Sequence, residues 1–591
     1  MISAALLACR AQAPSAVVSR AATERTPRSN VLRGDYVGSA ACAGCHAQIF
    51  SAWSRSPMHR MTRPAEGEAT APFDGRGLRL GKDEVKLLTL PGAEQPFLEL
   101  SQAGTKSLFR VTKVIGGRYR EDFVAEEVAL TQPFGTALAE QRVMPVSYLR
   151  FDGTLRYKGY SVMVPERPGL EAGLIWQQAC ILCHNTAPQF VALYDELHGD
   201  DEAPSYQGSA SNELPADAAF RYVIDDAEGL RRALTSELHL LGASGGLPNN
   251  PKHALEIAIS NTRERWTERA LVELGVGCES CHGGARAHAE APHSVRTSFG
   301  VQSDFMHVET AKGQPLTPAQ EVNRGCAKCH TVLFSQYPFT WEGGERRSAP
   351  GGSTTNSGEA RDFLLGGCSS AMTCATCHDP HGEDSRARLD ELLTPAGNRV
   401  CTSCHQQLAE RSALHAHSHH LPDGAGGACL SCHMPKKNMG LAYEFTAYHR
   451  IGSPTDTARV EGDRPLECSL CHADRTVDQI VSTMEKWWGK RYDRARLAKL
   501  YGRDLRQNPV RITLIGGKPH EQALAADIAV RQELSGTTES IVALLGNPYP
   551  LVRYFARHSL EHRFGATIPL DMNLPGPDLT QAARTWLAAP P

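Results

Sequence analysis

Residues 374–378 read Cys-Ala-Thr-Cys-His, and residues 401–405 read Cys-Thr-Ser-Cys-His. The same spacing, two cysteines separated by two residues and followed at once by histidine, occurs eight times in the 591-residue chain. Sixteen of the 18 cysteines belong to these motifs, and only Cys9 and Cys368 stand outside them. Chance would give about 0.02 such matches in a chain of this composition, so chemistry imposes the pattern.

The eight motifs are unevenly spread along the chain. Six of them crowd between Cys278 and His472, whereas the first two stand alone. In chain order, and numbered here as motifs one to eight, they are Cys42/Cys45/His46, Cys180/Cys183/His184, Cys278/Cys281/His282, Cys326/Cys329/His330, Cys374/Cys377/His378, Cys401/Cys404/His405, Cys429/Cys432/His433 and Cys468/Cys471/His472.

The chemistry of this motif has a geometric reason. Two thiols on a tight turn reach the two vinyl groups of one haem and form thioethers, and the adjacent histidine then lies under the iron as its proximal ligand. Structural zinc and dithiol redox chemistry are the competing interpretations. Neither requires a histidine directly after the second cysteine eight times. The sequence therefore predicts eight covalently bound c-type haems with iron as the metal.

Sixteen histidines lie outside the motifs, and they decide whether each iron has a second axial ligand. A second histidine closes the iron as an electron relay, and a missing one leaves a position for substrate. The predicted distal ligands are His59, His288, His381 and His449, together with one of His415, His417, His419 and His420, of which His417 is chosen. His198, His239, His253, His293 and His307 are weaker candidates. Up to three irons stay unassigned; Cys368, Met306 and Met372 are better explained as space-filling side chains.

The predicted fold class is mainly α with extensive loop. It comprises a multihaem cytochrome core, a small β-rich insertion and a C-terminal helical, HEAT-like region. Alternating runs at Phe97–Leu100, Ser107–Ile115 and Tyr157–Val164 predict the β-rich part. The predicted units are a signal remnant or lipoprotein tether (1–34), an N-terminal haem segment (35–82), the β-rich insertion (83–172), a core with seven haems (173–475) and the helical C-terminal region (476–591).

Helices are predicted over residues 47–56 and 477–488, and in the C-terminal region over 521–534, 538–545 and 551–562. Asn547 to Arg553 resembles the start of a single HEAT-type repeat. Two roles remain open for the C-terminal region, a docking surface for a partner and a cap packed on the haem core; the cap is favoured.

Composition and the N-terminus bear on location and partners. The chain has 62 basic and 65 acidic residues and a net charge of -3, which gives no reason to expect nucleic-acid binding. No apolar run is long enough to predict a transmembrane helix. Leu6 to Cys9 resembles a lipoprotein box that would tether the protein through Cys9, although a chance Leu-Ala-rich terminus explains it as well.

Several segments resemble a known family. Gly38 to His46, followed by Trp53 and Ser56 to His59, is similar to the opening of bacterial multihaem cytochromes with doubled CxxCH motifs, and Cys429 to Pro435 resembles a later part. The resemblance extends broadly to the group that includes pentahaem nitrite reductase, hydroxylamine oxidoreductase and octahaem tetrathionate reductase. It implies a periplasmic or otherwise extracytoplasmic protein with mostly bis-histidine irons. The lysine-ligated motif of pentahaem nitrite reductase is absent, because all eight motifs end in histidine.

Two functions follow from this sequence. The favoured one is a redox relay that takes electrons from a redox protein or a quinol-linked membrane donor and passes them to an acceptor. The alternative is an oxidoreductase with one open iron acting on a small nitrogen or sulfur compound. Its iron is placed at Cys326 and Cys329, because residues 337–356 contain no histidine and Arg324 can stabilise an anion. The catalytic residues of such an enzyme remain unknown, as does the oligomeric state.

Overall fold

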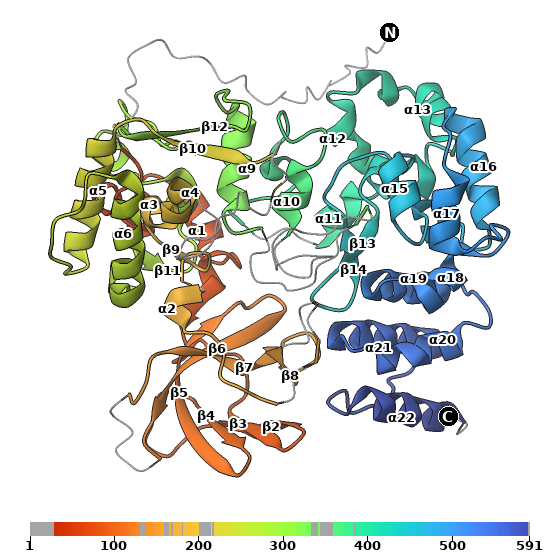
Figure 1. Ribbon diagram of the computed structural model, residues 1–591, viewed down its shortest axis with the longest axis horizontal. Coiled ribbons are helices and arrows are strands. Elements are labelled where there is room, and N and C mark those ends of the chain that lie inside the picture. Colours follow the sequence, from red (N-terminus) through yellow and green to blue (C-terminus); the bar gives the residue numbers. More distant parts are fainter. Residues whose placement is uncertain are drawn as a thin grey trace, which may run out of the picture.

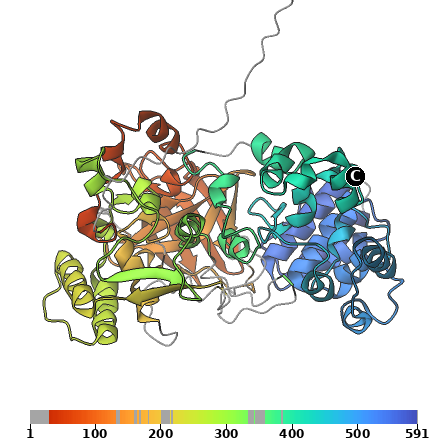
Figure 2. The ribbon, with the colours of Figure 1, turned by 90° about the horizontal axis from the view of Figure 1, so that it is seen from above.

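A computed structural model describes most of the chain. The described residues are 29–130, 137–158, 163, 165–166, 169–179, 181–199, 214, 218–331, 341–342, 358–382 and 386–588. Seen from above, the two halves of the sequence form two lobes that lie side by side (Figure 2). The sheet and the early motifs build one lobe, and the later motifs and the C-terminal helices build the other (Figure 1). Cys9 and Cys180 lie outside the described residues.

The first lobe is built on an eight-stranded antiparallel sheet in the order β2-β3-β4-β5-β6-β7-β8, with β1 paired to β5. Ala103 and Gly104 join β4 to β5 as a two-residue turn, and both have positive φ, which matches the twist of the flanking strands. The strands are β1 Thr62–Pro64, β2 Asp74–Leu80, β3 Asp83–Leu88, β4 Phe97–Gln102, β5 Thr105–Ile115, β6 Arg120–Val128, β7 Arg142–Leu149 and β8 Thr154–Tyr157.

This sheet corrects the predicted fold class. The chain is 43% helical and 16% strand, and the sheet curls until it is nearly closed, so "mainly α with extensive loop" is wrong. Two of the predicted strands, 97–100 and 107–115, fall on β4 and β5, and most of the third, 157–164, lies outside the described residues. Strands β2, β3, β6 and β7 were not recognised. Their alternation is interrupted by buried charged side chains such as Lys113, Glu121 and Asp122, which hid the period of two.

Helices cover the rest of the first lobe and surround its motifs. Trp176, Phe190, Leu230 and Leu255 are buried in one hydrophobic cluster there. The helices are α1 Ala47–Trp53, α2 Trp176–Ala179, α3 Gln189–Ala192, α4 Tyr194–His198, α5 Ala227–Leu240, α6 Pro251–Arg265, α7 Cys278–His282 and α8 Arg286–Glu290; the short strands are β9 Asn185–Thr186, β10 Phe220–Ile224, β11 Glu273–Leu274 and β12 Met306–Thr310.

The segment that carries motifs four to seven has almost no hydrophobic core of its own. Among its described residues between 365 and 427, Leu414 is the only buried hydrophobic side chain. A stretch of this length cannot fold on so little buried apolar surface, so another apolar body must fill its interior. Its elements are short: α9 Pro318–Ala327, α10 Glu359–Leu364, α11 Arg386–Leu392, α12 Arg399–Thr402, α13 Arg411–Ser418, α14 Cys429–His433, α15 Thr457–Gly462, and the hairpin β13 Lys436–Met439 and β14 Phe445–Ala447.

The C-terminal helices stack below the second lobe (Figure 1). Thr476 and Gln479 form a capping box that starts α16, and Gly489 ends it in the left-handed conformation, which confirms the helix predicted over 477–488. The helices predicted near 521–534, 538–545 and 551–562 are also confirmed. The elements are α16 Val477–Trp488, α17 Arg494–Tyr501, α18 Pro509–Gly516, α19 Pro519–Arg531, α20 Thr538–Ala543, α21 Pro550–Phe564 and α22 Gly576–Ala588.

These helices contact both the hairpin β13–β14 and the segment that follows the sheet. Tyr443 stacks on Tyr554 with ring centroids 4.8 Å apart. Arg553, 4% exposed, donates two parallel hydrogen bonds of 2.9 Å to the carboxylate of Glu166. A bidentate pair of this kind fixes the orientation of α21 relative to the first lobe.

Replacing Arg553 should therefore weaken the contact between the lobes. For Arg553→Ala we expect a loss of about 1–2 kcal/mol, because Glu166 is partly exposed and water replaces part of the lost interaction. Thermal unfolding followed by far-UV circular dichroism measures it. Arg557→Ala, which removes a more exposed arginine on the same helix, is the control. Equal melting temperatures for the two variants would contradict the role of Arg553.

Candidate haem-binding sites

Five of the eight proximal histidines face a second imidazole. The ring centroids of each pair lie between 6.0 and 6.3 Å apart. The second histidine of each pair comes from outside the motifs. The pairs are His46–His288, His282–His381, His378–His449, His433–His417 and His472–His420.

This separation fits an iron between the rings. A histidine nitrogen binds a metal ion at about 2 Å, and the ring centre lies about 1 Å behind that nitrogen, so two axial imidazoles have centroids about 6 Å apart. Several of these rings are also oriented through Nδ1, which hydrogen-bonds to a backbone carbonyl: Val295 O for His288 (2.7 Å), Ala447 O for His449 (3.0 Å) and Ser418 O for His420 (2.6 Å). That bond leaves Nε2 free to bind metal. The residues present therefore fit haem iron.

The structure places four of the five predicted distal histidines opposite a proximal one. His288, His381, His417 and His449 occupy such positions, but none faces the motif nearest to it in sequence. The fifth, His59, packs on Trp53 with ring centroids 4.1 Å apart and is not paired with a proximal imidazole in the described part of the chain. Sequence reasoning missed His420, because it allowed only one ligand from the cluster of four histidines.

Three proximal histidines, His184, His330 and His405, have no facing imidazole. The described residues include every histidine of the chain, and no ring contact between imidazoles involves these three. Near His405, the side chain of His415 on α13 hydrogen-bonds through Nδ1 to His420 O (2.8 Å) and so has its Nε2 available.

His330 and Arg324, the predicted open iron and its anion-binding partner, have other contacts. His330 Nδ1 lies 3.6 Å from a carboxylate oxygen of Glu359. Arg324 is 4% exposed and donates to Phe299 O at 3.3 Å and to the Tyr222 hydroxyl at 3.5 Å. These contacts give Arg324 a structural role, and most of residues 337–356 lies outside the described residues.

A recurring hydrogen bond joins the motifs in pairs. In three motifs, the residue three positions before the first cysteine accepts a hydrogen bond from the backbone N–H of the first cysteine of a second motif. Ser39 accepts from Cys278 (2.9 Å), Asn323 from Cys374 (3.1 Å) and Asn398 from Cys429 (2.8 Å). We call Ser39, Asn323 and Asn398 the clamp residues; each is at most 9% exposed.

The two asparagines make the same second bond. Asn323 donates to Met372 O at 2.9 Å, and Asn398 donates to Gly427 O at 2.8 Å. Each acceptor lies two residues before the cysteine that the asparagine clamps. The clamp thus aligns both ends of the turn that precedes a motif. Sequence analysis overlooked it, although a polar residue at this position three times was a usable signal.

The thiols show the same three pairs. Cys42 contacts Cys278, Cys326 contacts Cys374, and Cys401 contacts Cys429. In each pair these are the first cysteines of the two motifs. Because both thiols of a motif attach to one edge of a haem, their contact brings two haem edges together. Motifs one and three, four and five, and six and seven therefore form three modules.

Second cysteines connect the modules to one another. Burial and the neighbouring Cys329 thiol raise the pKa of Cys281 to about 11, which links the first module to the second. Contact with Cys429 and burial raise the pKa of Cys401, and Cys377 adds to this, which links the second module to the third. Burial and Cys471 raise the pKa of Cys432 to about 11, which links the third module to motif eight.

Two predicted attachment cysteines differ from the rest of the set. Cys45 and Cys404, the second cysteines of motifs one and six, are exposed and take no part in the thiol contacts described above. Cys471 is also exposed, but it lies close enough to Cys432 to affect its pKa. The sequence treated all sixteen cysteines alike, and the structure corrects this for Cys45 and Cys404. The reason is local, because the residues that follow each of them, including His46 and His405, are exposed as well. A haem attached there would keep one edge toward solvent.

Motif two lies at one end of the sheet. The backbone N–H of Trp176 donates to Gln141 O (2.9 Å), so α2 continues from the edge of β7 into the motif. Thr62 Oγ1 donates to the backbone carbonyl of His184 at 2.9 Å. Desolvation and the positive charge of Lys158 lower the pKa of His184 to about 4, and Asp122 acts in the opposite direction. The imidazole is thus close to a charged cluster on the sheet.

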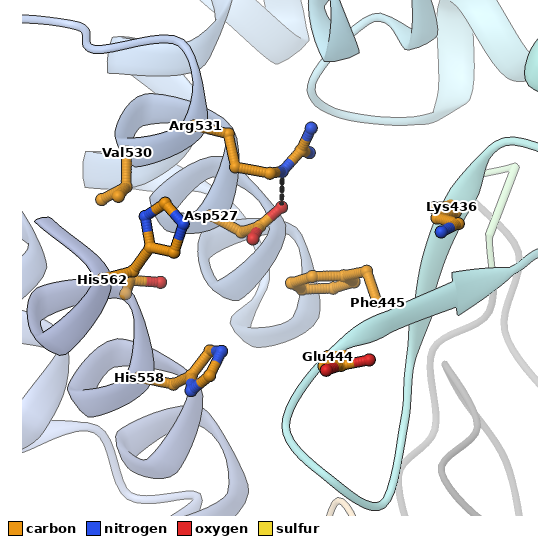
Figure 3. A pocket seen from close by; sticks show the side chains of 9 residues that line it. Lys436, Glu444, Phe445, Asp527, Val530, Arg531, His558 and His562 are labelled. Carbon is orange, nitrogen blue, oxygen red and sulfur yellow. Dashed lines mark hydrogen bonds and ion pairs between the residues drawn. The ribbon is translucent and has the colours of Figure 1, made fainter. Parts of the chain in front are cut away.

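A pocket of about 290 Å³ lies apart from these pairs, between the hairpin β13–β14 and helices α19 and α21 (Figure 3). Arg531 pairs with Asp527 at 2.7 Å on one side, and Phe445 lies across from them. His558 and His562 come from consecutive turns of α21 and face no proximal histidine. The described residues contain no group of three or more side chains suited to hold a separate metal ion.

The comparisons with known proteins agree with this geometry. A family model described as "Doubled CXXCH motif" matches residues 369–410. The chain is 25% identical over 201 residues to the multiheme cytochrome MtrA of Shewanella baltica, which covers 34% of the chain and 43% of that protein. It is 26% identical over 196 residues to the dissimilatory sulfite reductase MccA of Wolinella succinogenes, which covers 30% of the chain and 24% of that protein. The chain is a bacterial multihaem c-type cytochrome.

The matches leave much of this cytochrome unaccounted for. It spans less than half the length of both curated relatives. The outer cell wall cytochrome OcwA covers 90% of the cytochrome and is itself covered completely, at 15% identity and a TM-score of 0.34. The family match spans motifs five and six, which belong to different modules in the structure. Among the described residues, no helix combines the length and the apolar character needed to cross a bilayer.

Loss of one clamp should destabilise a single module. We expect Asn398→Ala to cost about 1–3 kcal/mol, because it leaves the buried N–H of Cys429 without an acceptor. Urea unfolding followed by haem absorbance measures this. Asn261→Ala, which removes an exposed amide bonded to Ile257 O, is the control. An unfolding midpoint for Asn398→Ala equal to that of the control would show that the clamp contributes nothing.

Proposed function

We propose that this cytochrome carries eight c-type haems and transfers electrons outside the cytoplasm. The facing imidazole pairs carry the proposal, because five separate pairs at 6.0 to 6.3 Å are difficult to explain without an iron in each. A haem supplies one-electron redox chemistry when bound, and two imidazole ligands keep that iron closed to other molecules. The chain's own contribution is to hold, orient and space the haems.

The order of the haems follows from the thiol contacts. Motifs one, three, four, five, six, seven and eight form a continuous line through the three modules and on to motif eight. Such a line suits a relay between a donor at one end and an acceptor at the other. A redox protein or a quinol-linked membrane protein is the proposed donor. Export and attachment through Cys9 would place the relay at a membrane surface in the periplasm.

The paucity of hydrophobic side chains between residues 365 and 427 supports the same proposal. Porphyrin rings supply the apolar surface that the chain lacks there. The segment should therefore not fold without haem. The proposal is tested first by the ratio of haem to protein, from pyridine haemochrome absorbance and intact mass. A ratio of eight is expected, and a lower ratio contradicts the haem count.

The axial ligands can be tested one pair at a time. In the protein as isolated with its haems, His288→Ala should convert about one-eighth of the iron from low-spin to high-spin, because the iron at His46 loses its second imidazole. Low-temperature EPR of the oxidised protein measures this. His293→Ala, an exposed histidine five residues further on, serves as the matched control. If both variants keep the wild-type spectrum, His288 is not a ligand.

A further inference from the structure

Motif two departs from the line of haems. Its described contacts with other motifs are with motif four: the Cys183 thiol contacts Cys329 and lies 3.8 Å from Lys328 O. Motif four is already joined to motifs three and five. Motif two is therefore a side branch that ends at His184, and a haem at the end of a branch exchanges electrons with the line through one neighbour.

The sheet places a charged cluster beside this branch. In the strand register, Thr62 pairs with Ile115 and Ile115 pairs with Asp122, so the threonine that holds the His184 carbonyl is two strands from Asp122. Asp122 is 4% exposed. It pairs with Lys158 at 2.5 Å and with Arg120 at 3.5 Å, and it accepts a hydrogen bond from Ser147. Two cations against one carboxylate leave the cluster positive.

We propose that the iron bound by His184 takes a small inorganic oxyanion, such as sulfite or nitrite, in its second axial position. This inference rests on the proposed haem-bearing function and adds a ligand-binding site to it. No imidazole faces His184 in the described residues. The positive cluster attracts an anion strongly because it lies in a partly desolvated region, where charges interact more strongly than in water.

The other two proximal histidines without partners are less suited to an anion. His330 has the carboxylate of Glu359 beside it, which repels negative charge. The surroundings of His405 are exposed, and α13, which carries His415, contacts the turn directly after it. His184 alone combines the end of a branch, a net positive cluster and packing against the sheet, where Ile181 and Leu182 join Val124 and Val143 in the buried cluster.

The test uses the complete protein with its haems. Sulfite and, separately, nitrite are titrated into the oxidised protein, and a high-spin EPR signal is followed as it changes. Lys158→Met should weaken anion binding about tenfold, since one positive charge near the anion is lost. Lys82→Met, which removes an exposed lysine from the turn between β2 and β3 of the same sheet, should leave the affinity unchanged.

Three results would overturn the inference. Equal anion affinities for Lys158→Met and Lys82→Met would show that the cluster does not face the bound anion. A new high-spin signal in His59→Ala, absent from the wild type, would show that His59 fills the position opposite His184. A haem ratio of eight without any anion-sensitive signal would leave the relay standing and remove only this site. A ratio of seven with Cys183 unmodified in peptide mass spectra would contradict the haem count and this inference together.

Discussion

The axial bonds between imidazole and iron are the constraint on which the motif-bearing parts of the structure depend. Each pair of rings must stay near 6 Å apart, whatever the distance between the two histidines in the sequence. His288 and His46 illustrate this, because the ligand comes from a helix that follows a different motif. The chain is therefore tied together across long loops at five points. Those ties take the place of the hydrophobic contacts that the described residues between 365 and 427 lack.

Hydrophobic cores of the ordinary kind lie around this segment. The sheet interior, the cluster around Trp176 and Phe190, and the C-terminal cluster around Ile528 and Phe555 are each densely apolar. They form rigid bodies against which the motif-bearing parts are fixed, through α2 and β7 in one lobe and through Tyr443 and Tyr554 in the other. The clamp residues act at a smaller scale, because each aligns two motifs with one buried side chain.

The sequence predicted the haem attachment sites, because that chemistry is encoded in five consecutive residues. It could not distinguish the exposed Cys45 and Cys404 from the cysteines that meet other motifs, since exposure depends on what packs against each turn. It did predict α16, whose apolar period and capping box are local. It did not predict the extent of the sheet, since buried charges such as Asp122 are paired across strands that only the fold brings together. The pairing of distal to proximal histidines was beyond sequence reasoning for the same reason: residues from different motifs meet only after folding.

The buried charges that disguised the sheet also explain its position in the molecule. A nearly closed sheet with an apolar interior needs no charged residues inside, and each buried charge carries a desolvation cost that its partners must offset. Asp122 meets that cost with Lys158, Arg120 and Ser147, all at the end of the sheet that holds motif two. A purely structural sheet would be more stable with apolar side chains there. A cluster retained at such a cost, beside the one motif that leaves the line, is best explained by what it does to the ligand of that iron.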